Sequence, residues 1–162
     1  MNDEFVSRYG GIYEHSPWVA EQVQAVLAGK EADHELLAEL MADCVDNASV
    51  ERQLKLIRAH PDLAGKAEVA GDLTADSSEE QSSAGLDQCT AEEFQQFQSL
   101  NREYKEKFGF PFIMAVRQSS RLEILRAFSA RIENDYDEEF ETALQEIHKI
   151  ARLRLAAMEQ SS

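Results

Sequence analysis

Apolar residues recur along the chain at intervals of three and four positions, and strand-like alternation is nearly absent. This spacing places apolar side chains on one face of a helix, so the pattern predicts an all-α fold. The clearest runs are Val19 to Leu27, Leu36 to Cys44, Leu54 to His60, Phe94 to Phe108 and Phe140 to Leu155. We expect about seven to nine helices in a single-domain bundle over 1–162, because no linker, internal repeat or low-complexity tract interrupts the pattern.

Residues typical of helix ends flank these runs. Ser16 and Pro17 are placed to open a helix that Gly29 can close, and Gly109 is placed to close the helix that starts at Thr90. Pro61 disfavours helical geometry in the preceding residue, so one helix should stop at about His60. The last helix should run from about Asp137 to Met158. Capping residues stand at Ser49 and in three possible capping boxes: Ser77 with Glu80, Thr90 with Glu93, and Ser120 with Glu123.

One segment departs from the helical pattern. Phe110 to Val116, with the sequence FPFIMAV, is apolar throughout, partly β-branched, and carries a proline near its start. We predict a short extended segment here. Its buried amide and carbonyl groups would need partners, and a bound polar ligand can be one of them.

The charge of the chain argues against several classes of partner. Sixteen basic and 31 acidic residues give a formal net charge of −15, which repels phosphate backbones and anionic lipid. We therefore expect no nucleic-acid partner and no membrane partner. No stretch approaches roughly 18 consecutive apolar residues, and neither a secretory signal nor a peroxisomal tripeptide is recognisable, so we expect a cytoplasmic protein.

His60 is the first candidate for chemistry, because imidazole can both give and take a proton near neutral pH. Pro61 follows it directly and restricts its backbone. For a histidine at a helix end, a structural role in binding the last carbonyl groups is the more common alternative.

Ser77, Glu80 and Gln81 would share one face of a helical turn, because they are spaced by three and four positions. A simple capping box with a solvated Gln81 is the more common explanation of this spacing. The alternative is a group of hydrogen-bonding side chains at a helix start, aimed at a ureido or carbonyl group.

Three arginines are candidates for binding an anion, because guanidinium holds a carboxylate or imide-like group in a fixed two-pronged geometry. They are Arg117, Arg152 and Arg154. Arginine on a terminal amphipathic helix is more often a solvated partner of a nearby glutamate, such as Glu146.

Other kinds of chemistry find little support in the sequence. Cys44 and Cys89 lie in no ligand-spaced pattern, and the histidines show no metal-ligand spacing. A nucleophile elbow and a phosphate-binding glycine loop are also missing. We therefore predict no metal and no cofactor, which leaves cofactor-free proton chemistry or a non-enzymatic helical interaction module.

Three stretches together resemble the 2-oxo-4-hydroxy-4-carboxy-5-ureidoimidazoline (OHCU) decarboxylase family of urate degradation. They are AHPDLAGK at Ala59 to Lys66, SSEEQSSAGL from Ser77 to Leu86, and YKEKFGFPFIMAVR from Tyr104 to Arg117, in the family's order and at compatible spacings. The resemblance implies an all-α homodimer that converts this ureidoimidazoline to (S)-allantoin and CO2 without a cofactor. A related enzyme acting on another ureide is an alternative.

The resemblance also implies roles for individual residues. His60 would be the proton donor that protonates a ring carbon on one face, and Glu80 its essential acidic partner. Arg154 matches the family's pocket arginine by position, with Arg152 and Arg117 left open. The order of proton transfers, the dimer surface and any association with the preceding hydrolase of the pathway also stay open. The remaining substrate-binding residues would be Pro61, Ser77, Ser78, Glu79 and Gln81, with Phe112, Ile113, Met114, Ala115 and Val116 contacting the ligand largely through backbone.

Overall fold

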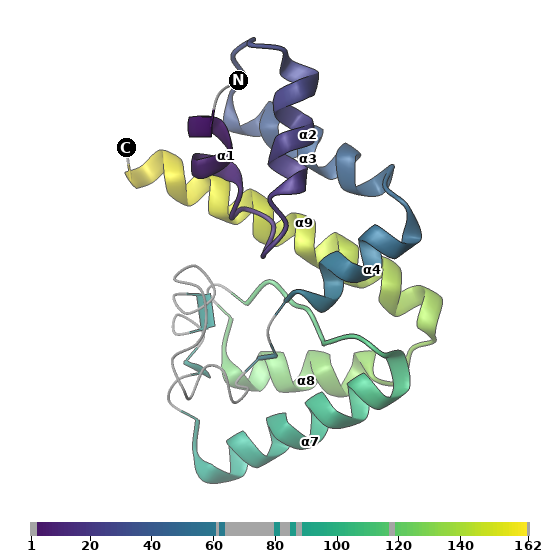
Figure 1. Ribbon diagram of the computed structural model, residues 1–162. Coiled ribbons are helices and arrows are strands. Elements are labelled where there is room, and N and C mark those ends of the chain that lie inside the picture. The colour runs from purple at the N-terminus through teal and green to yellow at the C-terminus, as the bar shows by residue number, and fades with distance from the viewer. Residues whose placement is uncertain are drawn as a thin grey trace. The chain divides into compact units, whose positions relative to one another are not determined.

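The computed structural model describes residues 3–60, 62–63, 80–81, 85–86, 89–116 and 119–161. These residues contain seven helices and no strand, which confirms the predicted all-α class (Figure 1). The chain divides into two compact units, one made of Met1–His60 with Ile147–Ser162 and the other of Pro61–Glu146. The single domain over 1–162 stays a prediction.

The first unit contains α1 (Asp3–Tyr9), α2 (Trp18–Leu27), α3 (His34–Asp46), α4 (Val50–Arg58) and the larger part of α9 (Tyr136–Ser161). Helix α2 packs against α1 and α3 (Figure 1). Most apolar positions at three- and four-residue spacing are buried, as the sequence pattern predicts, but Val26 and Leu36 of the predicted runs are 69% and 40% exposed. The buried positions include Val19 and Val23 of α2, Leu37, Met41 and Val45 of α3, Leu56 and Ile57 of α4, and Ile147, Ala151 and Leu155 of α9.

Helix ends in this unit follow the sequence signals only in part, since α2 closes at Ala28 with φ of 49°, one residue before the predicted Gly29. The Ser49 hydroxyl accepts a hydrogen bond from the Arg52 amide at 3.2 Å and caps α4, as predicted. The prediction that Ser16 caps α2 is wrong. Its hydroxyl instead donates to the Glu14 carbonyl oxygen at 3.0 Å, and Pro17 stands at the N-cap without a side-chain bond.

The second unit contains α7 (Ala91–Phe108), α8 (Arg121–Arg131) and the start of α9. Helix α7 packs against α8 (Figure 1). The Thr90 and Glu93 capping box is confirmed, with reciprocal bonds of 3.1 and 3.0 Å. Gly109 ends α7 in the left-handed region at φ 78°, which glycine adopts without steric cost. The Ser77 of another predicted box lies outside the described residues.

Aromatic side chains form the core of the second unit. The Phe112 ring stacks on Phe128 with 3.9 Å between ring centroids, and Tyr104 meets both rings edge-on. Phe112 belongs to the segment Phe110–Val116, which is neither helix nor strand, as predicted. Burial of its phenylalanines fixes this irregular segment against α7 and α8.

Candidate active site

His60 lies two residues beyond the end of α4, in the first unit, and is only 8% exposed. Its backbone amide donates to the Ile57 carbonyl at 3.2 Å, and its ring nitrogen Nδ1 lies 3.0 Å from the Leu56 carbonyl oxygen. A carbonyl oxygen can only accept, so Nδ1 carries the hydrogen. In the neutral ring, Nε2 therefore bears the lone pair and is the atom able to take up a proton.

The surroundings of His60 favour the neutral ring. Burial lowers the pKa of His60 to about 4, against opposing contributions from the Leu56 hydrogen bond and the Glu14 carboxylate. The positive charges of Arg154 and His15 lower the pKa further. At neutral pH the ring is thus a proton acceptor at Nε2, and it can donate from this atom only after taking up a proton.

The low pKa of His60 should make the free energy of unfolding depend on pH. The unfolded ring has a pKa near 6.5, so below this pH the unfolded chain binds a proton that the folded chain does not. Stability should therefore fall as the pH decreases from about 6.5 toward about 4, with a loss of about 2 kcal/mol from this group between pH 7 and about pH 5. Urea unfolding at the two pH values measures the loss. The variant His60→Asn should lose less stability than the wild type, and an equal loss would contradict the assignment.

Arg154 projects from α9 into the first unit and is 4% exposed. Its Nη2 donates to the Glu14 carboxylate at 2.9 Å, and its Nη1 donates to the carbonyl oxygens of Gly11 and Ile12 at 3.2 and 3.3 Å. Glu14 is itself 2% exposed, so the two side chains form a buried ion pair. The pair is neutral as a whole and fixes the guanidinium against the segment between α1 and α2.

The structure distinguishes between the candidate arginines of α9. Arg152 is exposed while Arg154 is buried, and Arg117 lies outside the described residues. Arg154 shares the buried stripe of Ala151 and Leu155, a position that helical spacing alone would have revealed. Leu153, which lies between Arg152 and Arg154 in the sequence, faces outward and is 38% exposed.

Glu14 is the functional candidate that the sequence did not reveal. It pairs with a residue 140 positions away, and no local motif indicates such a contact. Its neighbour Tyr13 is held by a second long-range contact, since its hydroxyl donates to Nδ1 of His148 at 2.7 Å. Nε2 of His148 lies 3.1 Å from the Asp46 carboxylate, which fixes the tautomer of His148. These contacts hold the segment that carries Glu14.

Glu80 and Gln81 lie in the second unit, where both are helical and buried. The Gln81 side-chain amide donates to the Asp62 carbonyl at 3.3 Å, and Lys105 forms an ion pair with the Asp62 carboxylate at 2.6 Å. The turn after the predicted proton donor is therefore anchored inside this unit. The other residues of this region that were predicted to bind the substrate lie outside the described residues. They are Pro61, Ser77, Ser78 and Glu79.

The predicted ligand-contacting segment 112–116 is held by side chains of the second unit. Phe112, Ile113 and Val116 are buried, and Met114 and Ala115 are partly exposed. Arg131 donates to the Ile113 carbonyl at 2.6 Å, and the Ala115 amide donates to Glu146 at 3.1 Å. Two of its polar backbone groups are thus satisfied by the protein, as buried irregular backbone requires.

Arg131 is in turn held by a buried carboxylate. Glu139 of α9 is 0% exposed and accepts hydrogen bonds from Arg131 Nε at 2.9 Å, from the Tyr104 hydroxyl at 2.5 Å and from Asn134 at 2.9 Å. The Arg131 guanidinium also lies 4.4 Å from the centre of the Phe112 ring. Glu139 therefore supports the segment 112–116 through Arg131.

The predicted site residues are distributed over both units. His60 and Arg154 are neighbours in the first, while Glu80, Gln81 and the segment 112–116 belong to the second. In the described part of the chain, no group of three or more His, Cys, Asp or Glu side chains could hold a metal ion. None of the described helices has the length and apolar character needed to cross a membrane.

Comparison with known proteins gives one consistent result. The family described as OHCU decarboxylase matches residues 1–156. The 2-oxo-4-hydroxy-4-carboxy-5-ureidoimidazoline decarboxylase of Haloferax volcanii is 44% identical over 155 residues, covering 96% of this chain and 89% of its own. The uric acid degradation bifunctional protein of a Bacillus species is 41% identical, covering 94% of this chain and 29% of its own. A crystal structure of OHCU decarboxylase in the presence of (S)-allantoin matches with a TM-score of 0.73 and 26% identity over 98% of both chains. The chain therefore belongs to the OHCU decarboxylase family.

Proposed function

We propose that the protein decarboxylates 2-oxo-4-hydroxy-4-carboxy-5-ureidoimidazoline to (S)-allantoin and CO2 in urate degradation. The observation that carries this proposal is the family match over residues 1–156, together with relatives named for this activity. The buried His60, with Nδ1 bound to the Leu56 carbonyl, supports proton transfer as its contribution. We predict no cofactor, because the substrate contains its own electron sink.

The reaction needs one bond broken and one stereocentre made. When the bond between the ring carbon and the carboxylate breaks, its electron pair moves toward the adjacent ring carbon-nitrogen double bond, and CO2 leaves. The hydroxyl on the same carbon then loses its proton and becomes the carbonyl group of the product. The carbon bearing the ureido group gains a proton, and the ring nitrogen that received the electron pair takes one from water. The face of the carbon that is protonated determines which enantiomer forms.

His60 is suited to move the hydroxyl proton. Nε2 of the neutral ring accepts it, and the imidazolium so formed delivers it to one face of the carbon that bears the ureido group. The ring thereby returns to its starting state in each turnover. The low pKa of His60 makes the ring an acceptor in the ligand-free protein and a strong donor once it is charged. This order of proton transfers extends the role of donor that the family resemblance implies.

The other site residues would bind and orient the substrate. We propose that Glu80 orients the substrate and that Ser77 and Gln81 hold its ureido and carbonyl groups. Segment 112–116 would contact the ligand through its backbone. Arg154 would favour the ring oxygens over the carboxylate, since a firm grip on the carboxylate would stabilise the ground state and slow its loss. The Glu14 carboxylate offsets the positive charge of Arg154, which supports weak binding of the substrate carboxylate by this arginine.

The test is an assay on freshly made substrate that follows the circular dichroism of the allantoin formed. Spontaneous decay gives racemic allantoin, so the expected signature of the enzyme is faster decay with a dichroic signal of the (S) form. A rate and signal equal to those of the buffer alone would overturn the proposal.

A thermal-shift experiment separates the alternatives. Binding of allantoin or a related ureide should raise the melting temperature of this protein by mass action. A stabilising shift without decarboxylation would indicate a related enzyme acting on another ureide. No shift with any ureide would indicate a non-enzymatic helical interaction module.

The oligomeric state and the cellular location of the protein are two further parts of the proposal. We propose that it is a homodimer located in the cytoplasm, as the family resemblance implies. Light scattering during size-exclusion chromatography measures the mass of the particle, for which twice the 18.3 kDa of one chain is expected. Fractionation of the host cell, followed by detection of the protein, tests its location.

A further inference from the structure

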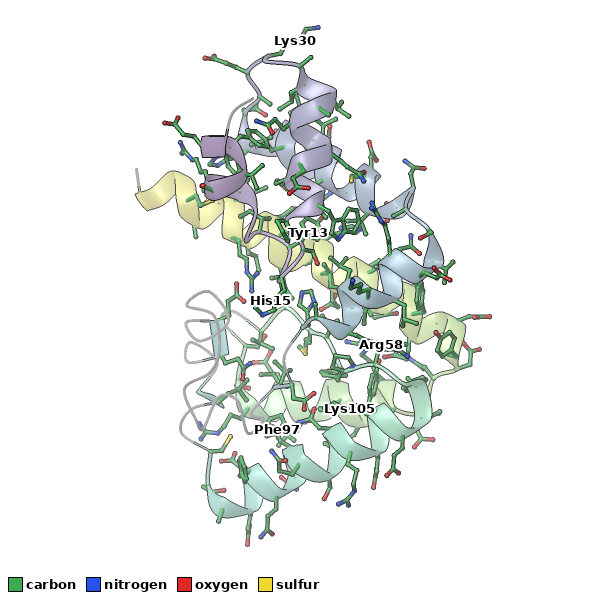
Figure 2. All side chains as sticks on the ribbon, in the orientation of Figure 1. Tyr13, His15, Lys30, Arg58, Phe97 and Lys105 are labelled. Atoms are coloured by element: carbon green, nitrogen blue, oxygen red, sulfur yellow. The ribbon has the colours of Figure 1, made fainter. Side chains whose placement is uncertain are left out.

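Glu14 is a buried carboxylate that the reaction described above does not use. It is 2% exposed and lies on the segment between α1 and α2, which also carries Tyr13 and His15 (Figure 2). Burying a carboxylate is costly unless it is paired, and Arg154 supplies the partner at 2.9 Å. A surface pair would avoid this cost, so the burial of the pair calls for an explanation.

The charges of the pair act on His60. All three residues belong to the first unit, and the Glu14 carboxylate favours the charged form of the His60 ring more than the Arg154 guanidinium disfavours it. In a buried place such interactions are weakened less by solvent and salt than they would be at the surface. The pair is neutral as a whole, and its carboxylate is the member that favours an imidazolium at position 60.

The backbone beside Glu14 is in an unusual conformation. His15 has φ of 51°, in the left-handed region that residues other than glycine occupy infrequently, although asparagine, aspartate and histidine do so more often than most. The His15 side chain points outward, with 64% of it exposed, and its Nε2 lies 3.8 Å from the Glu14 carboxylate. Such conformations persist only where surrounding contacts hold them, and here the bonds of Tyr13, Glu14 and Ser16 do so.

We propose that Glu14 is a positioning residue for the proton transfer, whose carboxylate holds Arg154 in place and stabilises the imidazolium that forms on His60 during turnover. The inference rests on the proposed function. The titratable and charged groups around His60 in this unit are Glu14 and His15 from the segment between α1 and α2, and Arg154 from α9. Among these, Glu14 supplies the negative charge.

The test compares Glu14→Gln with Glu14→Asp, which keeps the charge on a shorter side chain. We expect kcat of Glu14→Gln to fall about tenfold at neutral pH, the equivalent of one pKa unit at His60, with a smaller change in KM. Glu14→Asp should recover part of the loss. Glu51→Gln, which removes an exposed acidic charge from α4, serves as the control and should keep wild-type kcat.

A second readout does not depend on activity. Nitrogen chemical shifts of labelled His60 in the ligand-free protein report its protonation as the pH is lowered, and Glu14→Gln should move the midpoint to lower pH. Were Glu14→Gln unable to fold, the double variant Glu14→Gln with Arg154→Met leaves no buried charge unpaired and should move the midpoint in the same direction.

The outcomes separate the two proposals. Folded Glu14→Gln with wild-type kcat and an unchanged His60 midpoint would overturn the role of Glu14. Equal losses of kcat in Glu14→Gln and Glu14→Asp, with no change in the midpoint, would also overturn it, because they would indicate packing alone. Absence of decarboxylation in the wild type would overturn the proposed function, while the midpoint would still decide whether Glu14 acts on His60.

Discussion

Replacing His60 by asparagine should reduce stereospecific turnover at least about a hundredfold, the range in which a positioned acid or base contributes to a rate. The asparagine amide can still donate to the Leu56 carbonyl, so the local structure at the end of α4 is retained. What the variant loses is the Nε2 atom that, in the proposed mechanism, takes up the hydroxyl proton and returns it to carbon. The measurement is the dichroic signal of allantoin from freshly made substrate.

The matched control for this variant is His34→Asn, at the start of α3, because His34 has no part in the proposed site. It should keep the rate and the handedness of the wild type. Far-UV circular dichroism of both variants checks that the helices are intact. A His60→Asn protein that forms (S)-allantoin at the wild-type rate would remove His60 from the mechanism and return it to the structural role of a helix-end histidine.

Replacing Glu139 by glutamine should lower the free energy of unfolding by about 3–5 kcal/mol, because it leaves the charge of Arg131 buried without its partner. Glu139 is fully buried and accepts hydrogen bonds from Arg131, Tyr104 and Asn134. The glutamine amide has one acceptor oxygen instead of two. Its NH2 group would therefore face one of the three groups that donate to Glu139, and neither could accept the other's hydrogen. Urea unfolding followed by far-UV circular dichroism measures the loss.

The control for Glu139→Gln is Glu138→Gln, which makes the same change at the neighbouring exposed residue of α9. It should alter the free energy of unfolding by less than about 0.5 kcal/mol. The double variant Arg131→Met with Glu139→Leu removes both charges but leaves the Ile113 carbonyl and the Tyr104 hydroxyl without these partners, so it should not restore the wild-type stability. A Glu139→Gln protein as stable as the wild type would show that the pair does not hold Arg131 and the segment 112–116 in place.

The fold was predictable where its signals are local. Helical spacing, the capping box of Thr90 and the glycine after α7 each act within a few residues, and all are found in the structure. The cap of α2 was not predictable in this way, because the N-cap position falls on Pro17, which has no side-chain oxygen, and the Ser16 hydroxyl donates to the Glu14 carbonyl. Helix α1, which no apolar run indicated, also lay beyond the sequence pattern.

The candidate site was predictable only in part, because several of its contacts join residues that are far apart in the sequence. His60 stands out by its type and by the proline after it, but its tautomer follows from a hydrogen bond seen only in the structure. Glu14 and Glu139 carry no local signal, because their partners Arg154 and Tyr104 lie 140 and 35 positions away. Whether an acidic residue is solvated or buried depends on such contacts, which sequence spacing does not encode.

Leu56 contributes both to the packing of the core and to the orientation of the His60 ring. Its side chain is buried in the core, and its carbonyl oxygen orients the His60 ring. A substitution such as Leu56→Ala would leave that carbonyl chemically unchanged, yet the space it opens would let the last turn of α4 shift. The direction in which Nε2 points, and with it the enantiomeric purity of the product, would then depend on how well the hydrophobic interior is filled. Under the proposed mechanism, an apolar replacement that removes no reacting atom could therefore lower the enantiomeric purity of the product.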